Sequence, residues 1–272
     1  GVGLVGSEMC IRDSSVTLAA GIALGGLKAI VAIYSTFLQR AFDQLVHDVN
    51  LQNLDVMFAI DRAGLVGADG ETHHGIYDIS FMRILPNIIL MTPSNERELL
   101  LMLNTGLSHK GPSAIRYPRG NTGCHDIVMT EEKVSIGKSK LIQKGQKLAI
   151  LVFGQLLSEV IDISIKLSLT LVDMRFAKPI DKERLDELSN THQHIITIED
   201  NVVTGGAGSS INEYLVEKGY EITVTNFGIP DQIISHGSQN ELYAEIGLDK
   251  KSLEYRINKI YDHISNNKKI VK

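Results

Sequence analysis

From Ser15 onward the chain alternates between two spacings of apolar residues. Short runs of β-branched residues, each long enough for one strand, are separated by longer segments in which apolar positions recur every three or four residues. This alternation is typical of a mostly parallel sheet with helices on both faces, because parallel strands need a crossover connection between them. The pattern therefore predicts an α/β fold.

The first half of the chain predicts one such unit over residues 15–120. We expect strands at 28–34, 55–61, 88–92 and 113–117, and helices at 15–25, 36–52, 78–84 and from Ser94 onward. The helix over 36–52 is the best defined, because an apolar residue returns at every fourth position. Ser94 is the expected N-cap of the last helix, since Glu96 and Glu98 follow in its first turn.

A second unit follows a stretch without a long apolar period. We therefore predict a linker at 121–146 and a second, independent α/β domain at 147–272. Its strands are expected at 147–153, 170–174, 195–199 and 222–226, with helices between them and two more at the C-terminus. The sequence thus predicts two consecutive, mostly parallel-sheet domains.

Residues 1–14 do not fit this pattern. They show no useful periodicity, and the chain does not begin with methionine. Gly1, Gly3 and Gly6 spell G-x-G-x-x-G, but no strand precedes them, so we interpret the match as chance. We expect residues 1–14 to be a non-native leader.

Charge and composition exclude several classes of protein. The 272 residues carry 27 Lys and Arg against 32 Asp and Glu, a net charge of -5 with no basic stripe, which disfavours a nucleic-acid binder. Two cysteines, Cys10 and Cys124, cannot build a disulfide framework, which fits a reducing, cytoplasmic setting. The most apolar stretch, 18–38, is interrupted by glycines and Lys28, so it is interpreted as a helix, a turn and a strand.

Polar and aromatic residues follow three predicted strands of the first unit, at the ends where open parallel sheets bind ligands. They are Tyr34 at the end of the first strand with Phe37 and Arg40 after it, Arg62, Asp69, Glu71, His73 and His74 after the second, and Arg119 after the fourth. Two arginines at one edge suit an anionic substrate, because a guanidinium matches phosphate or carboxylate oxygens. A histidine beside an aspartate suits acid–base chemistry near neutral pH.

Plainer interpretations of these residues stay open. The two arginines are equally compatible with surface salt bridges, the loop histidine with a solvated side chain, and Phe37 with core packing. No metal site is predicted, because four ligands packed so closely together, within residues 69–74, rarely surround one ion. The segment Glu199-Asp200 before the glycines at 205–208 could form an anion-accepting helix N-terminus, but close helix packing explains those glycines better.

Several segments carry a family resemblance. They are Tyr34 to Gln44, Asp61 to His73 (D-R-A-G-L-V-G-A-D-G-E-T-H), Arg116 to Gly120 (R-Y-P-R-G), Leu171 to Phe176 with Lys178-Pro179, and G-G-A-G-S at 205–209. Together they closely resemble the 1-deoxy-D-xylulose-5-phosphate synthase family of transketolase-like thiamine diphosphate enzymes. That family has three domains, and this chain resembles the last two, the pyrimidine-binding domain and the C-terminal domain.

The resemblance implies a cofactor and a reaction. Phe37 would stack on the aminopyrimidine of thiamine diphosphate, and Tyr34 and Arg40 would shape that end of the site. The implied activity condenses pyruvate with glyceraldehyde 3-phosphate, with loss of carbon dioxide, and feeds isoprenoid precursor and thiamine synthesis. Mg²⁺ would be bound by the N-terminal diphosphate-binding domain that this chain does not resemble, and a cytoplasmic homodimer is expected.

The resemblance also implies roles on the substrate side. Arg62 and Arg119 would grip the phosphate of glyceraldehyde 3-phosphate. Asp69 and His73 would contact the substrate or intermediate and manage its protons. These four residues are therefore the implied catalytic and substrate-binding set.

One departure from the family bears on activity. Just before the segment matching 16–26, the family has Glu-Gln-His, whose glutamate drives the cofactor into its reactive tautomer. Arg12-Asp13-Ser14-Ser15 stand at that place, and Glu8 is not in register. Since the diphosphate ligands are also absent, we expect no turnover from this chain by itself.

Two alternatives remain. The β subunit of a 2-oxo acid dehydrogenase has the same two-domain layout and would co-purify with a separate α chain. A non-catalytic α/β scaffold would pair each arginine with an internal carboxylate and leave no open cleft between them.

Overall fold

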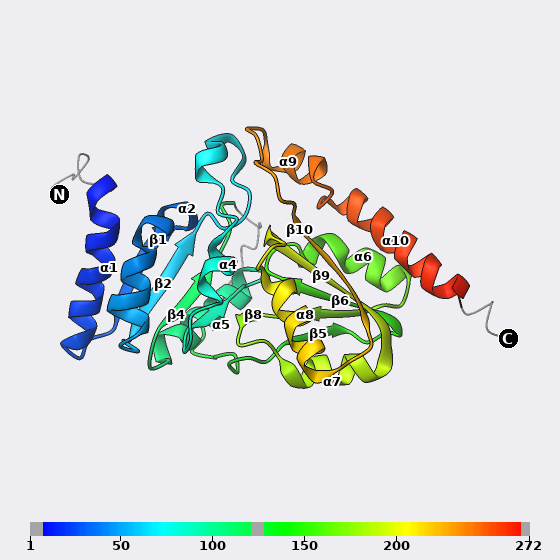
Figure 1. The fold of residues 1–272 in the computed structure, drawn as a ribbon, viewed down its shortest axis with the longest axis horizontal. Coiled ribbons are helices and arrows are strands. Elements are labelled where there is room, and N and C mark those ends of the chain that lie inside the picture. Colours follow the sequence, from blue (N-terminus) through cyan, green and yellow to red (C-terminus); the bar gives the residue numbers. More distant parts are fainter. Residues whose placement is uncertain (1–7, 121–127, 268–272) are drawn as a thin grey trace.

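The computed structural model describes residues 8–120 and 128–267, which form two five-stranded sheets flanked by helices (Figure 1). The strand order is β1-β2-β4-β3-β8 in the first sheet and β10-β9-β6-β7-β5 in the second. Each sheet has four parallel strands and one antiparallel edge strand. The predicted α/β class is confirmed.

The first sheet follows the predicted strands closely. Its parallel strands are β1 (Ala29–Tyr34), β2 (Val56–Asp61), β3 (Ile89–Met91) and β4 (Ser113–Arg116). Helices α1 (Glu8–Leu24), α4 (Asp78–Met82) and α5 (Glu96–Ser108) pack around it. Helix α1 begins seven residues before the predicted start at Ser15, because residues 8–14 contain no Gly or Pro to stop it.

The helical segment after β1 changes type along its length. It runs through α2 (Ser35–Leu38), a 3-10 turn (Gln39–Ala41), α3 (Phe42–Gln44) and a π-helix (Leu45–Asn50). Ala41, Leu45 and Val49 are fully buried at a spacing of four residues. Positions four residues apart lie on one face of a helix, so these three side chains pack into the same buried core.

The N-cap of α5 differs from the prediction by one residue. Asn95 occupies the cap, and its side-chain oxygen accepts a hydrogen bond from the Glu98 amide at 3.0 Å. The predicted cap, Ser94, instead donates its hydroxyl to Asp173 Oδ2 at 2.6 Å. Ser94 therefore joins the two halves of the chain, which a local capping rule does not anticipate.

The second sheet contains every strand predicted for it and one more. Its strands are β5 (Lys140–Gln143), β6 (Lys147–Phe153), β7 (Thr170–Asp173), β9 (His192–Val202) and β10 (Thr223–Ile229). Its helices are α6 (Leu157–Lys166), α7 (Lys182–Thr191), α8 (Ala207–Lys218), α9 (Gln239–Glu245) and α10 (Lys250–Asn267). The predicted linker 121–146 thus contains strand β5, while residues 121–127, including Cys124, lie outside the described residues.

The two units are not independent, contrary to the prediction. Residues Phe176–Lys178 form β8, which leaves the second half of the chain and pairs antiparallel with β3. A three-residue strand carries too little pattern to be recognised in a sequence. One buried apolar cluster also continues from α1 into the second sheet, so the two halves share a core.

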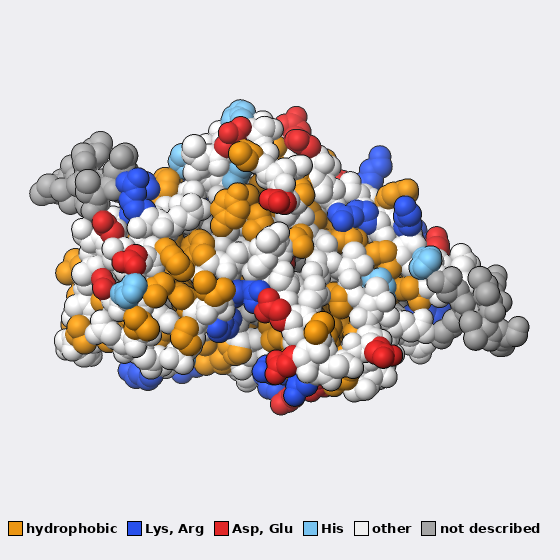
Figure 2. All heavy atoms as spheres, viewed as in Figure 1, with side chains coloured by type: hydrophobic (Ala, Val, Ile, Leu, Met, Phe, Trp, Pro, Cys, Tyr) orange, Lys and Arg blue, Asp and Glu red, His pale blue; other side chains and the backbone are white. Residues whose placement is uncertain are grey.

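Charged side chains are scattered over the face of the protein drawn in Figure 2. Figure 2 shows Lys and Arg side chains in small groups among Asp and Glu on that face, and no single basic stripe. Within 8–120 and 128–267, no helix combines the length and apolar character needed to cross a bilayer.

Candidate active site

The loop at 62–75 joins β2 to α4 at the carboxyl edge of the first sheet. Its neck is closed by two hydrogen bonds, from Gly64 N–H to Gly75 O at 2.7 Å and from Gly75 N–H to Gly64 O at 2.8 Å. Between them, two short 3-10 turns carry Asp69 and His73. The loop is therefore an ordered projection with a fixed base.

Three rings meet beside this loop. Tyr34 ends β1, and its ring stacks on Phe37 of α2 with centroids 5.1 Å apart and an interplanar angle of 17°. His73 meets Phe37 edge-on at 5.4 Å. The guanidinium of Arg62 lies 3.9 Å above the Tyr34 ring. We call Tyr34, Phe37 and His73 the ring cluster; with Ala32 and Ile33 they line a cavity of about 480 Å³.

A carboxylate joins the two predicted phosphate-binding arginines. Arg119 Nη1 lies 2.6 Å from Asp69 Oδ1, and Arg62 Nε lies 3.6 Å from Asp69 Oδ2. Asp61 holds Arg62 from the other side, with Oδ2 2.6 Å from Nη1. Arg62 has a φ of 58°, an uncommon value for a residue with a side chain. Both arginines therefore form ion pairs with carboxylates of the protein.

An open cleft nevertheless borders this pair. The Arg119 side chain is 47% exposed, and it lines a cavity of about 260 Å³. Tyr117, Gln155 and Gln239 also line that cavity, so both halves of the chain contribute to it. The scaffold alternative required paired arginines without a cleft, and only the first of these two conditions is met.

Two of the predicted positions lie outside this arrangement. Arg40 is exposed on the 3-10 turn after α2 and does not line the cavity beside the ring cluster. His74 is buried and points toward the second domain: its Nδ1 accepts from the Val66 amide at 3.2 Å, and its Nε2 donates to Ser235 O at 3.4 Å. Burial lowers the pKa of His74, so its ring is a neutral structural bridge.

The acidic residues and histidines of the loop at 62–75 are not gathered around one point. Glu71 is exposed, and His74 is turned away from Asp69 and His73. Within 8–120 and 128–267, no group of three or more His, Cys, Asp or Glu side chains is arranged to hold a metal ion.

Arg12 covers one face of the ring cluster. This residue of α1 places its guanidinium 3.6 Å from the centroid of Phe37. A guanidinium is planar, so the Phe37 face accepts a flat group stacked against it. The predicted leader therefore reaches the predicted cofactor position.

A carboxyl group of the protein itself occupies the glycine segment at 205–209. Both oxygens of Glu199 accept hydrogen bonds from the first amides of α8, those of Ala207 and Gly208, each at 2.8 Å. A Cβ on Gly206 would lie 2.4 Å from Glu199 Oε2, so the glycine is required by this close packing. The packing interpretation of these glycines agrees with this geometry. Burial raises the pKa of Glu199 to about 8.

A buried cluster of charged side chains lies behind the loop, and the sequence did not predict it. Arg116, at the end of β4, contacts the carboxylates of Asp78 and Asp200. All three side chains are at most 2% exposed. Their positions are 38 and 84 residues apart along the chain, so no local motif signals the cluster.

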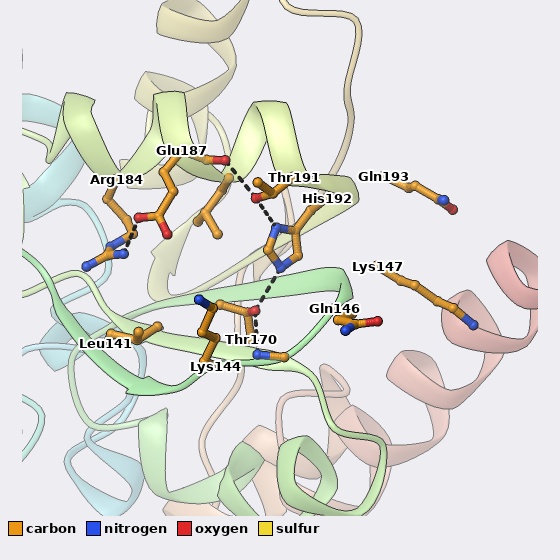
Figure 3. Close-up of a pocket in the computed structure, with 12 residues that line it drawn as sticks. Leu141, Lys144, Gln146, Lys147, Thr170, Arg184, Glu187, Thr191, His192 and Gln193 are labelled. Atoms are coloured by element: carbon orange, nitrogen blue, oxygen red, sulfur yellow. Dashed lines mark hydrogen bonds and ion pairs between the residues drawn. The ribbon is translucent and has the colours of Figure 1, made fainter.

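A cavity of about 460 Å³ lies at the opposite edge of the second sheet (Figure 3). It is lined by the first residues of three strands, Lys147, Thr170 and His192. His192 Nε2 is 2.7 Å from Thr170 Oγ1, and its Nδ1 is 2.9 Å from Thr191 Oγ1. Figure 3 shows Lys147 directed away from these groups. Burial lowers the pKa of His192, so this cavity presents a neutral imidazole already engaged by the protein.

Comparisons with known proteins identify both halves of the chain. The family model for the transketolase pyrimidine binding domain matches residues 13–124, and that for the transketolase C-terminal domain matches residues 137–253. The 1-deoxy-D-xylulose-5-phosphate synthase of Psychromonas ingrahamii is 52% identical over 253 residues, covering 93% of this chain and 41% of that protein. The enzyme of the same name from Haemophilus influenzae is 54% identical over 247 residues, covering 90% of this chain and 39% of that protein.

Solved structures show the same fold. A chain described as a split gene transketolase, inactive β4 tetramer, superposes with a TM-score of 0.79 at 24% identity, covering 91% of this chain and 80% of that chain. Transketolase from Campylobacter jejuni superposes with a TM-score of 0.70 at 15% identity, covering 91% of this chain and 38% of that one. The chain spans about two fifths of the length of its curated relatives, 41% for the Psychromonas protein. It belongs to the transketolase family, with the pyrimidine-binding and C-terminal domains, and within that family it is similar to the 1-deoxy-D-xylulose-5-phosphate synthases.

Proposed function

We propose that this chain supplies the pyrimidine-binding and C-terminal domains of a 1-deoxy-D-xylulose-5-phosphate synthase. That enzyme condenses pyruvate with glyceraldehyde 3-phosphate with loss of carbon dioxide, a step toward isoprenoid precursors and thiamine. One observation carries the proposal: two arginines converge on Asp69 directly beside the ring cluster. This edge of the sheet thereby offers a stacking surface next to a pair of guanidinium groups.

The arginine pair suits the phosphate of the aldehyde substrate. A phosphate dianion can accept hydrogen bonds from two guanidinium groups at once, and such charge-assisted bonds are among the strongest in proteins. Arg119 is half exposed and faces the cavity, so its donors can reach an incoming phosphate. Asp69 holds the two arginines in place until the phosphate arrives.

Thiamine diphosphate fits the ring cluster at its aminopyrimidine end. Phe37 and Tyr34 would hold the heterocycle by stacking, in the cavity of about 480 Å³ that they line. Arg12 shows that the Phe37 face takes a planar group, and a heterocycle there would displace it. When bound, the cofactor supplies the electron sink for decarboxylation and carbon–carbon bond formation. Mg²⁺ would be bound by a diphosphate-binding domain outside this chain.

His73 and Asp69 would handle protons and orientation. The hydroxyl of Thr72 is 2.9 Å from His73 Nδ1, so a substrate proton would be managed at Nε2. The edge-on contact with Phe37 restrains the orientation of the imidazole. Asp69 lies between the arginines, where it would orient the part of the aldehyde nearest the phosphate.

We infer that the working enzyme is a homodimer in the cytoplasm. We also infer that this chain does not turn over its substrates without a diphosphate-binding domain. A subunit of a two-chain enzyme is the second candidate, because the split gene transketolase chain shares this fold over 80% of its own length. A 2-oxo acid dehydrogenase β subunit would be one such protein.

The test compares the chain alone with a chimera. The chimera joins the chain to the part of the Psychromonas ingrahamii relative that it does not match. With pyruvate, glyceraldehyde 3-phosphate, thiamine diphosphate and Mg²⁺, we expect 1-deoxy-D-xylulose 5-phosphate from the chimera and none from the chain. Product from the chain alone would refute the predicted inactivity. Failure of a folded chimera to turn over, together with activity on adding a separate α chain, would favour the second candidate.

A further inference from the structure

The carboxyl end of β4 carries a buried arginine that reaches into both halves of the protein. Arg116 Nε donates to Asp78 Oδ2 at 2.7 Å, and its Nη1 donates to Asp200 Oδ1. Asp78 begins α4 beside the first sheet, whereas Asp200 lies in β9 of the second sheet. One guanidinium therefore ties the C-terminal domain to the strand end that leads into the candidate active site.

The same pair supports the neck of the loop at 62–75. Arg116 Nη2 donates to Gly75 O at 3.4 Å, on one side of the neck. On the other side, a Cβ placed on Gly64 would lie 2.7 Å from Asp200 Oδ2. The neck thus rests on the Arg116–Asp200 pair, and Gly64 permits this approach because it has no side chain and a φ of 77°.

Arg116 also begins the turn that carries Arg119. Directly after it, Tyr117 N–H donates to Ile60 O, and Tyr117 O accepts from Ala63 N–H, both at 3.0 Å. These bonds tie the turn to the strand end from which Arg62 projects. A shift of Arg116 would therefore move the loop and the turn together.

We propose that Asp200 is a positioning residue: through Arg116 it fixes the loop and the turn that bring Arg62, Asp69 and Arg119 together. Its carboxylate is buried and does not contact the cavity directly, so it acts through its partners. Gln155 completes the arrangement, because its Nε2 donates to Asp200 Oδ2 at 3.0 Å and lies 2.9 Å from Tyr243 Oη. The C-terminal domain thereby acts on the site without contributing a catalytic group. This inference rests on the proposed function only for the identity of the ligand, a phosphate-bearing aldehyde.

The protein contains a matched control for Asp200. Glu98 is another buried carboxylate that joins the two halves: its Oε1 is 2.8 Å from Arg175 Nη2 and 3.1 Å from Lys140 Nζ. It lies on α5, and its ion-pair partners Arg175 and Lys140 are not part of the loop at 62–75. Asp200→Asn and Glu98→Gln therefore make the same chemical change in two interdomain networks, and only the first network supports the loop.

The first experiment measures amide hydrogen exchange in the 272-residue chain, without any need for activity. The amides of Gly64 and Gly75 are the readout, because they bond to each other across the neck. We expect Asp200→Asn to raise their exchange by about tenfold and Glu98→Gln to leave it unchanged. Unchanged exchange in Asp200→Asn, or an equal rise in both variants, would overturn the proposal.

The second experiment measures kinetics in the chimera. We expect Asp200→Asn to raise the KM for glyceraldehyde 3-phosphate by about tenfold, with kcat and the KM for pyruvate within about twofold of the parent. A purely structural role would lower stability without this split. If exchange rises while the aldehyde KM does not, the anchoring of the loop stands and the phosphate assignment of the proposed function fails.

A milder variant keeps the proposal testable if Asp200→Asn does not fold. Gln155→Ala removes one hydrogen bond from Asp200 and leaves Arg116 with both carboxylates. We expect it to raise the exchange of the Gly64 and Gly75 amides by about threefold. Unaltered exchange in folded Gln155→Ala would also overturn the proposal.

Discussion

The carboxyl edges of the two sheets use similar side chains in opposite ways. At the first edge, Arg62, Asp69 and Arg119 are partly exposed, and Arg119 borders an open cavity. At the second edge, Glu199 is fully buried, and both its oxygens are engaged by the amides that begin α8. The same α/β layout thus keeps one strand end available for ligands and closes the other. Charged residues after a strand indicate a site only when their partners leave them accessible.

The largest expected effect concerns pH and the closed edge. Because burial raises the pKa of Glu199 to about 8, the folded protein holds a proton that the unfolded chain releases near the ordinary glutamate pKa of 4.5. The stabilisation from this group is complete below the unfolded pKa and is lost as pH rises toward 8. Between pH 5 and 8 we expect a loss on the order of 3 kcal/mol in the free energy of unfolding, measured by urea denaturation.

Glu199→Gln supplies the control for this effect. The amide does not titrate, so the variant should lose most of this pH dependence even though it is less stable overall. If the free energy of unfolding fell equally steeply with pH in the parent and the variant, Glu199 would not be protonated in the folded protein.

The next effect concerns the open edge. Arg119→Ala in the chimera should raise the KM for glyceraldehyde 3-phosphate by about 30-fold, because a charge-assisted contact to phosphate contributes about 2 kcal/mol. Steady-state kinetics with each substrate varied in turn measure this change. Arg184→Ala is a suitable control, since Arg184 is also ion-paired but lies on α7. An unchanged aldehyde KM in Arg119→Ala would remove the phosphate role from this edge.

The smallest expected effect concerns access to the ring cluster. Arg12→Ala removes the guanidinium from the Phe37 face, a contact worth about 0.5–1 kcal/mol at an exposed site. Binding of thiamine to the chain, measured by calorimetry, should therefore tighten by about threefold. Weaker binding in the variant would mean that Arg12 helps to hold the ring rather than competing with it.

Much of this edge was predictable from the sequence, for a physical reason. Runs of β-branched residues indicate strands, and parallel strands bring their carboxyl ends to one edge of the sheet. The grouping of Tyr34, Arg62 and Arg119 could therefore be predicted from the pattern alone. The structure brings these three residues together with Asp69 and His73. Their individual roles came from family resemblance and remain predictions.

The remaining features depend on distant partners. Arg116 lies inside a predicted strand, and nothing in its local sequence shows that its partners come from α4 and β9. Ser94 has the composition of a cap but bonds Asp173 instead, because the second half of the chain lies within reach. Arg40 lies only six residues beyond Tyr34, the last residue of β1, yet the turn after α2 leaves it exposed. Local patterns cannot predict choices that tertiary packing makes.

Strand β8 has a consequence for how this protein can be divided. If the gene were cut between the two halves and each piece expressed alone, the first piece would expose the backbone of β3 along an unprotected border. Such borders recruit other chains and lead to aggregation. Domain shuffling, whether in evolution or in the laboratory, would therefore have to carry Phe176–Lys178 along with the first half.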